Sequence, residues 1–285
     1  MTVWPPILDQ NLAGRLAMEE PEFGALAERL GARLGGRPFE SADLERALGY
    51  PWERPVESFF MQDGAVQLLE SSDHVEALEL GDAPRYPLIT FGSNGAPGVL
   101  SAKLSVLDED SRDVLVLAGE LAGFDVVASA HVALYGAMPA TIVPAAETSV
   151  RAGLLLVTAE QFTALTRTEF NYAVARIDGS PFSSDLDWSV PDAVFAYVSR
   201  NGAFALGGEH VALRAVPARG RSNHELDQEH LLNEAAAVIF GPGFEAIDVV
   251  RRTIADYAWV IEVARPALSA VTNPFSPEDW QLLGR

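Results

Sequence analysis

The sequence predicts an α+β protein in which a small curled or closed β-sheet is flanked by helices at both ends of the chain. Helix-type patterns occupy the first part of the chain and the stretch after residue 221, whereas strand-type patterns fill the middle. The predicted strands are short, and turn pairs such as Asn201-Gly202 and Gly207-Gly208 join some of them. Such segregation is typical of the α+β class, and many short strands favour a small barrel.

Size and composition indicate an ordinary globular protein. The 285 residues are enough to bury a large core in one domain or two, and 48% of them are apolar. No apolar run approaches the roughly 18 residues of a membrane helix. The chain has no cysteine, which excludes disulfides and thiolate chemistry. We expect a cytoplasmic location, since the first residues show neither a basic segment nor an apolar signal core.

The charge balance limits the classes of partner that we expect for this protein. The net charge is −20, from 40 acidic and 20 basic residues. Such a surface repels phosphate backbones and anionic membranes, so we expect neither nucleic acid nor a membrane as a partner. The expected partner is a small molecule. An anionic ligand would need a locally positive site made by backbone N–H groups or a few arginines.

Residues 1–82 are predicted to form a helical N-terminal extension that ends in a hairpin. One helix is indicated by apolar residues at helical spacing, namely Phe23, Leu26, Leu30 and Leu34. A second, short helix over residues 42–48 has Ser41 as its expected cap. Two apolar runs, 56–61 and 65–69, flank an Asp-Gly pair that favours a hairpin.

Residues 83–221 carry most of the strand patterns. A short strand at 88–91 leads into a sharp turn at 92–96, and Pro97 suits the first position of a helix that ends near residue 104. Thr158 and Gln161 match a capping box, which predicts that a helix begins directly after the strand at residues 152–157. The further predicted strands are 114–118, 124–128, 137–143, 152–157 and 172–177.

The last part of this region predicts a β-meander over residues 194–216, joined by the two glycine-containing turns. Residues 222–285 then return to helical patterns. Two helices are expected at 227–240 and 245–263, with Gly241-Pro242-Gly243 between them and Pro266 ending the second. Their apolar faces (Leu231, Leu232, Ile239, Ile247, Val250 and Ile254) would cover the barrel or a second subunit.

The turn Gly92-Ser93-Asn94-Gly95 is the first candidate binding element. A glycine-rich turn between a strand and a helix leaves several backbone N–H groups pointing one way, and the helix start adds partial positive charge. Together they hold a carboxylate or phosphate without any basic side chain. An ordinary tight turn is the alternative, and the absence of a following Gly-Lys-Ser/Thr excludes a phosphate-binding P-loop.

Glu169 is the candidate base. It falls where a helix ends and a strand begins, and helix C-termini favour cations, so the helix dipole does not explain an acid there. Burial would raise the pKa of this carboxyl and make it a usable base near neutral pH. The alternative is a solvated acid that pairs with Arg167 or Arg176.

Phe91-Gly92-Ser93-Asn94 resembles the Tyr-Gly-Ser-Asn signature of the gamma-glutamylcyclotransferase-like family. Three further matches follow in the family's order: Pro139-Ala140-Thr141-Ile142, the strand and helix of residues 153–165, and Glu169 followed by Tyr172. The similarity covers roughly residues 86–216. The resemblance implies a small mixed β-barrel with helices, to which this chain adds the helical extensions at both ends.

The resemblance also implies a reaction and a site. Backbone groups of the signature loop hold the glutamyl end of a substrate, and the glutamate takes a proton from the α-amine. The amine then attacks the γ-carbonyl and releases 5-oxoproline, with no metal or organic cofactor. Glu169 would be the base, and the candidate substrate-binding residues are Phe91, Gly92, Ser93, Asn94, Tyr135, Thr141 and Tyr172. Phe91 replaces the family's tyrosine, so one hydroxyl is missing.

Other patterns are weaker. His131 lies between two predicted strands and could reach the pocket mouth with Tyr135, but a loop histidine is favoured. His224-Glu225 begins like a zinc-protease helix, yet Gln228 stands where the second histidine is required. Gly241–Ala246 fits a dinucleotide fingerprint by letter but follows no clear strand. We therefore expect no metal and no cofactor.

Three functions stay open: a gamma-glutamylcyclotransferase-like enzyme, a non-catalytic protein that binds an amino acid or carboxylate in the same pocket, and an interaction protein. The expected oligomeric state is a monomer or a homodimer.

Overall fold

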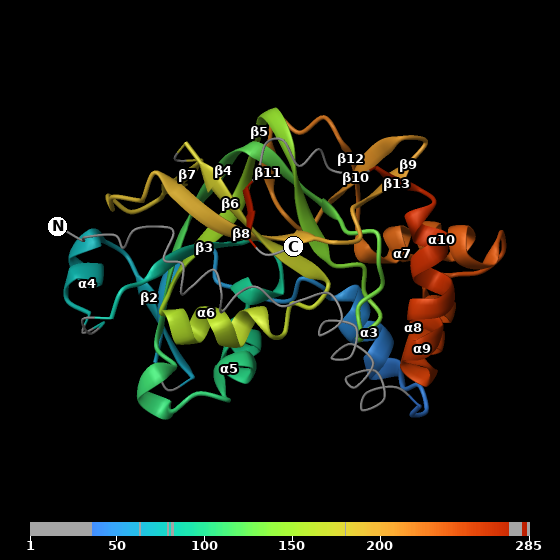
Figure 1. Cartoon of the computed structure of the whole chain (residues 1–285), viewed down its shortest axis with the longest axis horizontal. Helices are drawn as coiled ribbons and strands as arrows, with labels where there is room; N and C mark the ends of the chain where they lie inside the picture. The colour runs from blue at the N-terminus through green and yellow to red at the C-terminus, as the bar shows by residue number, and fades with distance from the viewer. Residues whose placement is uncertain are drawn as a thin grey trace.

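The structure is a computed structural model and describes residues 36–62, 64–78, 80, 83–179, 181–273 and 281–283. The helix predicted from Phe23, Leu26, Leu30 and Leu34 lies outside these residues. The described part confirms the α+β class, with a large twisted sheet at the centre and helices around it (Figure 1).

The strands belong to one 14-stranded sheet whose main path runs β13-β9-β10-β4-β5-β3-β8-β6-β14. Their bounds are β1 Ser58–Gln62, β2 Ala65–Leu69, β3 Tyr86–Thr90, β4 Val114–Ala128, β5 Ala140–Val157, β6 Tyr172–Asp178, β7 Phe182–Ser184, β8 Ala193–Ser199, β9 Ala203–Leu206, β10 Glu209–Leu213, β11 Ala218–Arg219, β12 His224–Leu226, β13 Thr272–Asn273 and β14 Gln281–Leu283. The main helices are α3 Ser41–Leu48, α4 Ser72–Glu76, α5 Pro97–Leu104, α6 Ala159–Thr166, α7 Gln228–Phe240, α8 Ala246–Ala255, α9 Tyr257–Trp259 and α10 Arg265–Ser269.

The sheet is open, which corrects the expected small closed barrel. Its two end strands, β13 and β14, pair with β9 and β6 and not with each other. The physical reason lies in the length of β4, which changes partners along its course. β1 pairs with its first residues, β7 with residues 119–121, and β10 at Val127. The sheet therefore branches at its edges instead of closing on itself.

The two longest strands were predicted as four short ones. β4 is a continuous strand of 15 residues and β5 one of 18, and they pair antiparallel with a register shift between Ala122 and Phe124. Gly123 lies at that shift with a φ of +80°, so it forms a bulge and does not end the strand. The hairpin of β1 and β2 is present, and β1 hydrogen-bonds to β4, so it extends this sheet.

The predicted meander is present only in its second half. Gly207 and Gly208 join β9 to β10 as an antiparallel hairpin. The turn at Asn201-Gly202 does not join paired strands, because β8 lies between β3 and β6 and is parallel to β3. The strand after the turn thus crosses to another part of the sheet.

Alternating residues of the central strands enter two cores. On β4 and β5, Leu115, Leu117, Leu154 and Leu156 face the larger core, while their neighbours Val116 and Leu155 face the smaller one. The smaller core is covered by α5 and α6, which lie side by side below the sheet in Figure 1. The larger core is covered by α7, α8 and the segments after them, with α3 packed against α7 and α8.

The C-terminal helices use their apolar faces within the chain. Leu231, Leu232, Val250 and Ile254 are buried in the larger core. The single helix expected at 245–263 is interrupted at Asp256, whose side chain accepts the Trp259 N–H and starts α9. Pro266 stands in the first turn of α10 and does not end a helix.

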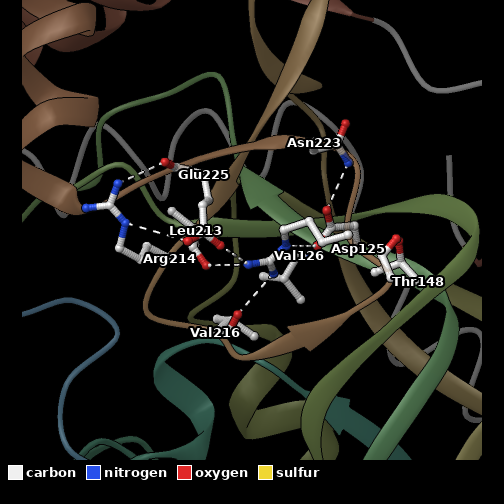
Figure 2. Close-up of polar contacts among 10 residues, drawn as sticks. Asp125, Val126, Thr148, Leu213, Arg214, Val216, Asn223 and Glu225 are labelled. Carbon is white, nitrogen blue, oxygen red and sulfur yellow. Dashed lines mark hydrogen bonds and ion pairs between the residues drawn. The ribbon is translucent and has the colours of Figure 1, made fainter.

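A buried ion pair attaches the segment after β10 to the sheet. The Asp125 carboxylate, on β4, is fully buried and accepts hydrogen bonds from Arg221 (2.9 Å), Asn223 (2.9 Å) and the Val126 N–H (2.8 Å). Figure 2 shows Asn223 hydrogen-bonded to this carboxylate. Because each carboxylate oxygen is hydrogen-bonded, the buried charge is compensated.

Candidate functional site

The strand–turn–helix unit predicted around the signature loop is present. β3 is buried along its whole length and ends at Thr90, and α5 begins with Pro97. Between them a 3-10 turn at Ser93–Gly95 uses the amides of Gly95 and Ala96 for its own hydrogen bonds. The unit therefore holds the loop rigidly at one end of the sheet.

The other loop amides are the ones that matter for a ligand. Among the described residues, the N–H groups of Gly92 and Asn94 have no backbone or side-chain acceptor. The Ser93 N–H lies within hydrogen-bonding reach of the Tyr50 hydroxyl. Two unengaged amides at a strand–helix junction can hold a carboxylate or a polarised carbonyl oxygen.

Tyr50 also explains why residue 92 is glycine. A Cβ atom at Gly92 would lie 2.6 Å from the Tyr50 hydroxyl oxygen. That oxygen accepts the Ala140 N–H at 2.9 Å, so it is not free to move away. Burial raises the pKa of Tyr50, which keeps the phenol neutral. A hydroxyl thus touches the loop even though Phe91 has none.

Glu169 is held by two partners from the loop side. Its Oε1 accepts from Lys103 Nζ at 2.5 Å and from Asn94 Nδ2 at 3.0 Å, and Lys103 also donates to Asn94 Oδ1 at 2.8 Å. The side chains of Glu169 and Lys103 are 12% and 18% exposed. The carboxylate is therefore sheltered and paired, and its partner is Lys103 and not Arg167 or Arg176. Its second oxygen has no partner among the described side chains and amides.

The loop and Glu169 line the same cavity, whose volume is about 600 Å³. α5 contributes Val99, Ala102 and Lys103 to the lining, and Val106 lines the cavity just after the helix ends. Ile254 reaches it from α8, so both helical layers take part. This size accommodates a small organic ligand.

Aromatic side chains form another part of the lining, next to the loop. Tyr135, predicted from the sequence, packs against both Tyr50 (ring centroids 6.0 Å apart) and Trp52 (4.9 Å apart). Arg46 places its guanidinium 5.6 Å from the Trp52 ring centroid. Burial, with smaller contributions from Tyr50 and Glu169, raises the pKa of Tyr135, so its hydroxyl stays neutral beside the carboxylate.

The remaining predicted residues are placed differently. Phe91 and Tyr172 line the cavity; Tyr172 donates to the Ala140 carbonyl at 2.9 Å, and the Phe91 carbonyl accepts from Arg54 at 2.7 Å. Thr141 does not line it. This fully buried residue lies behind the wall, where its hydroxyl accepts the Ser199 N–H at 3.1 Å.

His131 belongs to the cavity wall, not to an exposed loop. It is 1% exposed, and its Nδ1 is 2.6 Å from the Ser129 hydroxyl, which lies 2.5 Å from the Ser199 hydroxyl. Burial and, to a lesser degree, the charge of Arg265 lower its pKa to about 3. The imidazole is thus neutral at physiological pH and contributes a fixed polar edge next to Tyr172, 5.8 Å away between ring centroids.

Sequence reasoning missed four residues of this site: Lys103, Tyr50, Trp52 and Arg46. A signal existed for Lys103, because it shares a helical face with the apolar residues that line the cavity. No local pattern marked the other three, which come from the extension predicted to lie outside the catalytic region.

The described part of the chain contains no group of three or more acidic or histidine side chains placed to hold a metal ion. His230, on α7, is hydrogen-bonded to Asp227, and Asp185 is paired with Arg151.

None of the described helices is long and apolar enough to cross a membrane.

A scan against protein-family models, a search of curated proteins and a search of solved structures found no match to this chain.

Proposed function

We propose that this protein is an enzyme of the gamma-glutamylcyclotransferase type, which acts on a γ-glutamyl or related small amide with Glu169 as the general base. The observation that supports this most is the shared cavity: Glu169, whose side chain is largely sheltered, and the loop residues Gly92 and Asn94, whose N–H groups have no acceptor among the described residues, all line it. A base and a group of main-chain donors are the two elements that intramolecular amide attack requires.

In the proposed reaction the loop amides hold the glutamyl part of the substrate. Glu169 takes a proton from the substrate's α-ammonium group, and the freed nitrogen attacks the γ-carbonyl carbon. A carbon–nitrogen bond forms to close the five-membered ring, and the original amide bond breaks. The two protons that the attacking nitrogen loses end on the departing amine, so the products are 5-oxoproline and an ammonium compound. An N–H donor near the γ-carbonyl oxygen stabilises the charge that develops there.

Lys103 and Asn94 have a positioning role in this proposal. Both bind Glu169 through Oε1, which leaves the second carboxylate oxygen for the substrate nitrogen. Holding a base within about 0.5 Å of its working position is what a rigid supporting contact contributes. The Lys103 ammonium also balances the charge that Glu169 brings into the cavity.

The second candidate is a binding protein that uses the same cavity without turnover. The Lys103–Glu169 ion pair favours it, because an ammonium 2.5 Å from the carboxylate competes with the substrate amine for that group. The ligand would be a small amino acid or carboxylate held by the loop amides.

One experiment separates the two. The full-length protein is incubated with a panel of γ-glutamyl amino acids, γ-glutamyl amines and glutathione, and 5-oxoproline release is measured. Release from at least one compound supports the enzyme. A ligand that raises the melting temperature but yields no product supports the binding protein, and neither product nor stabilisation contradicts both.

A further inference from the structure

We propose that the cavity contains a second subsite, made of Arg46, Tyr50, Trp52 and Tyr135, that takes a planar apolar group carrying a carboxylate. This inference rests on the proposed function for its position in the reaction: the group held here is the amine that leaves, as in an amide of an aromatic amino acid. The subsite itself rests on its own geometry.

Three aromatic rings converge on one side of the cavity. The Tyr50 and Tyr135 rings are stacked, with centroids 6.0 Å apart and an angle of 18° between planes. The Trp52 ring lies 4.9 Å from Tyr135 and 5.6 Å from Tyr50, tilted against both. All three line the cavity. Ring faces arranged in this way offer a planar ligand group stacking and edge contacts in one place.

Arg46 supplies the charge. Its guanidinium carbon lies 5.6 Å from the Trp52 ring centroid and 5.9 Å from the Tyr135 centroid, so two ring faces hold it. No carboxylate of the described residues lies within ion-pair distance of it, and the nearby Asp43 is paired with Arg37. In a chain of net charge −20, a guanidinium held by rings instead of an acid is available to an incoming anion.

The backbone at Trp52 supports a role for this ring. Among the residues that the structure describes, Trp52 is the only one other than glycine with a left-handed backbone, at φ +66°. That conformation is costly for a bulky side chain and persists only where the surroundings impose it. Here the indole Nε1 donates to the Arg46 carbonyl at 2.9 Å, and the Trp52 N–H donates to the Gly49 carbonyl at 2.8 Å. Strained residues of this kind cluster at ligand-binding positions.

The subsite borders the reacting end of the cavity. The Tyr50 hydroxyl is in contact with Gly92 of the loop, as its 2.6 Å distance from a Cβ built there shows. Burial raises the pKa of the Tyr135 phenol, and the negative charge of Glu169 raises it further, so the two side chains interact. A substrate whose glutamyl end lies at the loop therefore extends its other end over these rings.

The test is a calorimetric titration of the full-length protein with three probes: 3-phenylpropionate, phenethylamine and butyrate. The first has both the ring and the carboxylate, and each of the others lacks one of them. We expect 3-phenylpropionate to bind about tenfold or more tightly than either, the effect of one charge-assisted hydrogen bond or one stacked ring. Arg46→Gln, at an exposed position, should remove the advantage over phenethylamine, and Trp52→Leu the advantage over butyrate.

Arg251→Gln is the matched control, because Arg251 also lies over an aromatic ring (Phe39, 5.3 Å) but does not line the cavity. It should bind 3-phenylpropionate as the parent does. Equal affinity for the three probes, no binding of any, or an unchanged preference in Arg46→Gln would overturn the subsite.

Turnover distinguishes this inference from the proposed function. If the protein is a cyclotransferase with this subsite, kcat/KM for γ-glutamylphenylalanine exceeds that for γ-glutamylalanine, and Trp52→Leu reduces the difference. Binding of 3-phenylpropionate without 5-oxoproline from any γ-glutamyl compound would reject the reaction and retain the subsite. Equal kcat/KM for the two substrates would retain the reaction and reject the subsite.

Discussion

Glu169 shows at the residue scale how far the sequence could predict the site. The order of a few motifs along the chain predicted that Glu169 stands before a strand and faces the Gly92–Gly95 loop. The motifs did not predict its pairing with Lys103, because the helix dipole already explains a lysine in the last turn of a helix. The two residues are 66 positions apart, and no local pattern connects them.

Lys103→Met should reveal the coupling between the pair. It leaves a sheltered carboxylate without its ammonium, and we expect it to lower the free energy of unfolding by about 1–3 kcal/mol, between the values for exposed and buried pairs. Adding Glu169→Gln should recover part of that loss. Urea denaturation of the parent, both single variants and the double variant measures the coupling. Strictly additive losses would show that the ion pair contributes nothing.

His131 predicts a pH dependence of stability. Its pKa is lowered from 6.5 to about 3 in the folded protein, mainly by burial. The unfolded chain therefore takes up this proton first as the pH falls. The contribution is complete above about pH 6.5 and declines toward pH 3, by about 1.4 kcal/mol per pH unit. His131→Gln keeps an acceptor for Ser129 but does not titrate, so its stability should fall less steeply below pH 6.5.

Urea denaturation between pH 8 and pH 4.5 measures the two slopes. The region above pH 7 is the internal control, since the curves of the parent and the variant should run parallel there. Parallel curves over the whole range would contradict the assignment of a buried neutral imidazole.

At the scale of elements, turns that look alike in the sequence have different roles. The strand–turn–helix unit and the Thr158 capping box were predictable, because each depends on neighbouring residues only. The length of β4 was not, since the glycine at position 123 forms a bulge that keeps the strand continuous. The destination of β8 was not predictable either, because it depends on long-range pairing with β3 and β6.

Gly136 lies in the loop that carries His131 and Tyr135, and its backbone packs closely against Val250 on α8. Its φ is +87°, and a Cβ there would lie 2.9 Å from Val250 Cγ1. We expect Gly136→Ala to cost about 1–2 kcal/mol for the backbone and a further 1–3 kcal/mol for the clash. Gly123→Ala is the matched control, because its φ is +80° and no atom lies within 4 Å of its Cβ position. Denaturation midpoints that are equally lowered in both would contradict a specific contact with α8.

At the scale of the whole molecule, the cavity is assembled from distant parts of the chain. The segment after α3 supplies Tyr50 and Trp52, β3 and α5 supply the loop and Lys103, and α8 supplies Ile254. The helical layers predicted as additions to a catalytic barrel therefore contribute directly to the candidate site. Periodicity predicts such amphipathic layers, but it does not tell which end of the sheet they cover.

Asp125 is predicted to be important for the stability of the whole molecule, since it attaches the chain after β10 to the longest strand pair (Figure 2). Asp125→Asn removes one partner of a buried ion pair, which typically costs about 3–5 kcal/mol. Asp185→Asn is the control: its pair with Arg151 is exposed, and such pairs contribute at most about 1 kcal/mol. Thermal and urea denaturation give both values. Equal losses would contradict the special position of Asp125.

Release of 5-oxoproline by Glu169→Gln, relative to the parent and with the γ-glutamyl compound that the parent converts best, decides whether Glu169 is the general base. Glutamine keeps the size of the side chain but removes its basicity. The account predicts that kcat falls by about 10²–10⁴, the usual contribution of a general base, while the calorimetric Kd of that compound stays within about threefold. Glu160→Gln, an exposed position on α6, should leave both quantities unchanged. Undiminished turnover in Glu169→Gln would contradict the account.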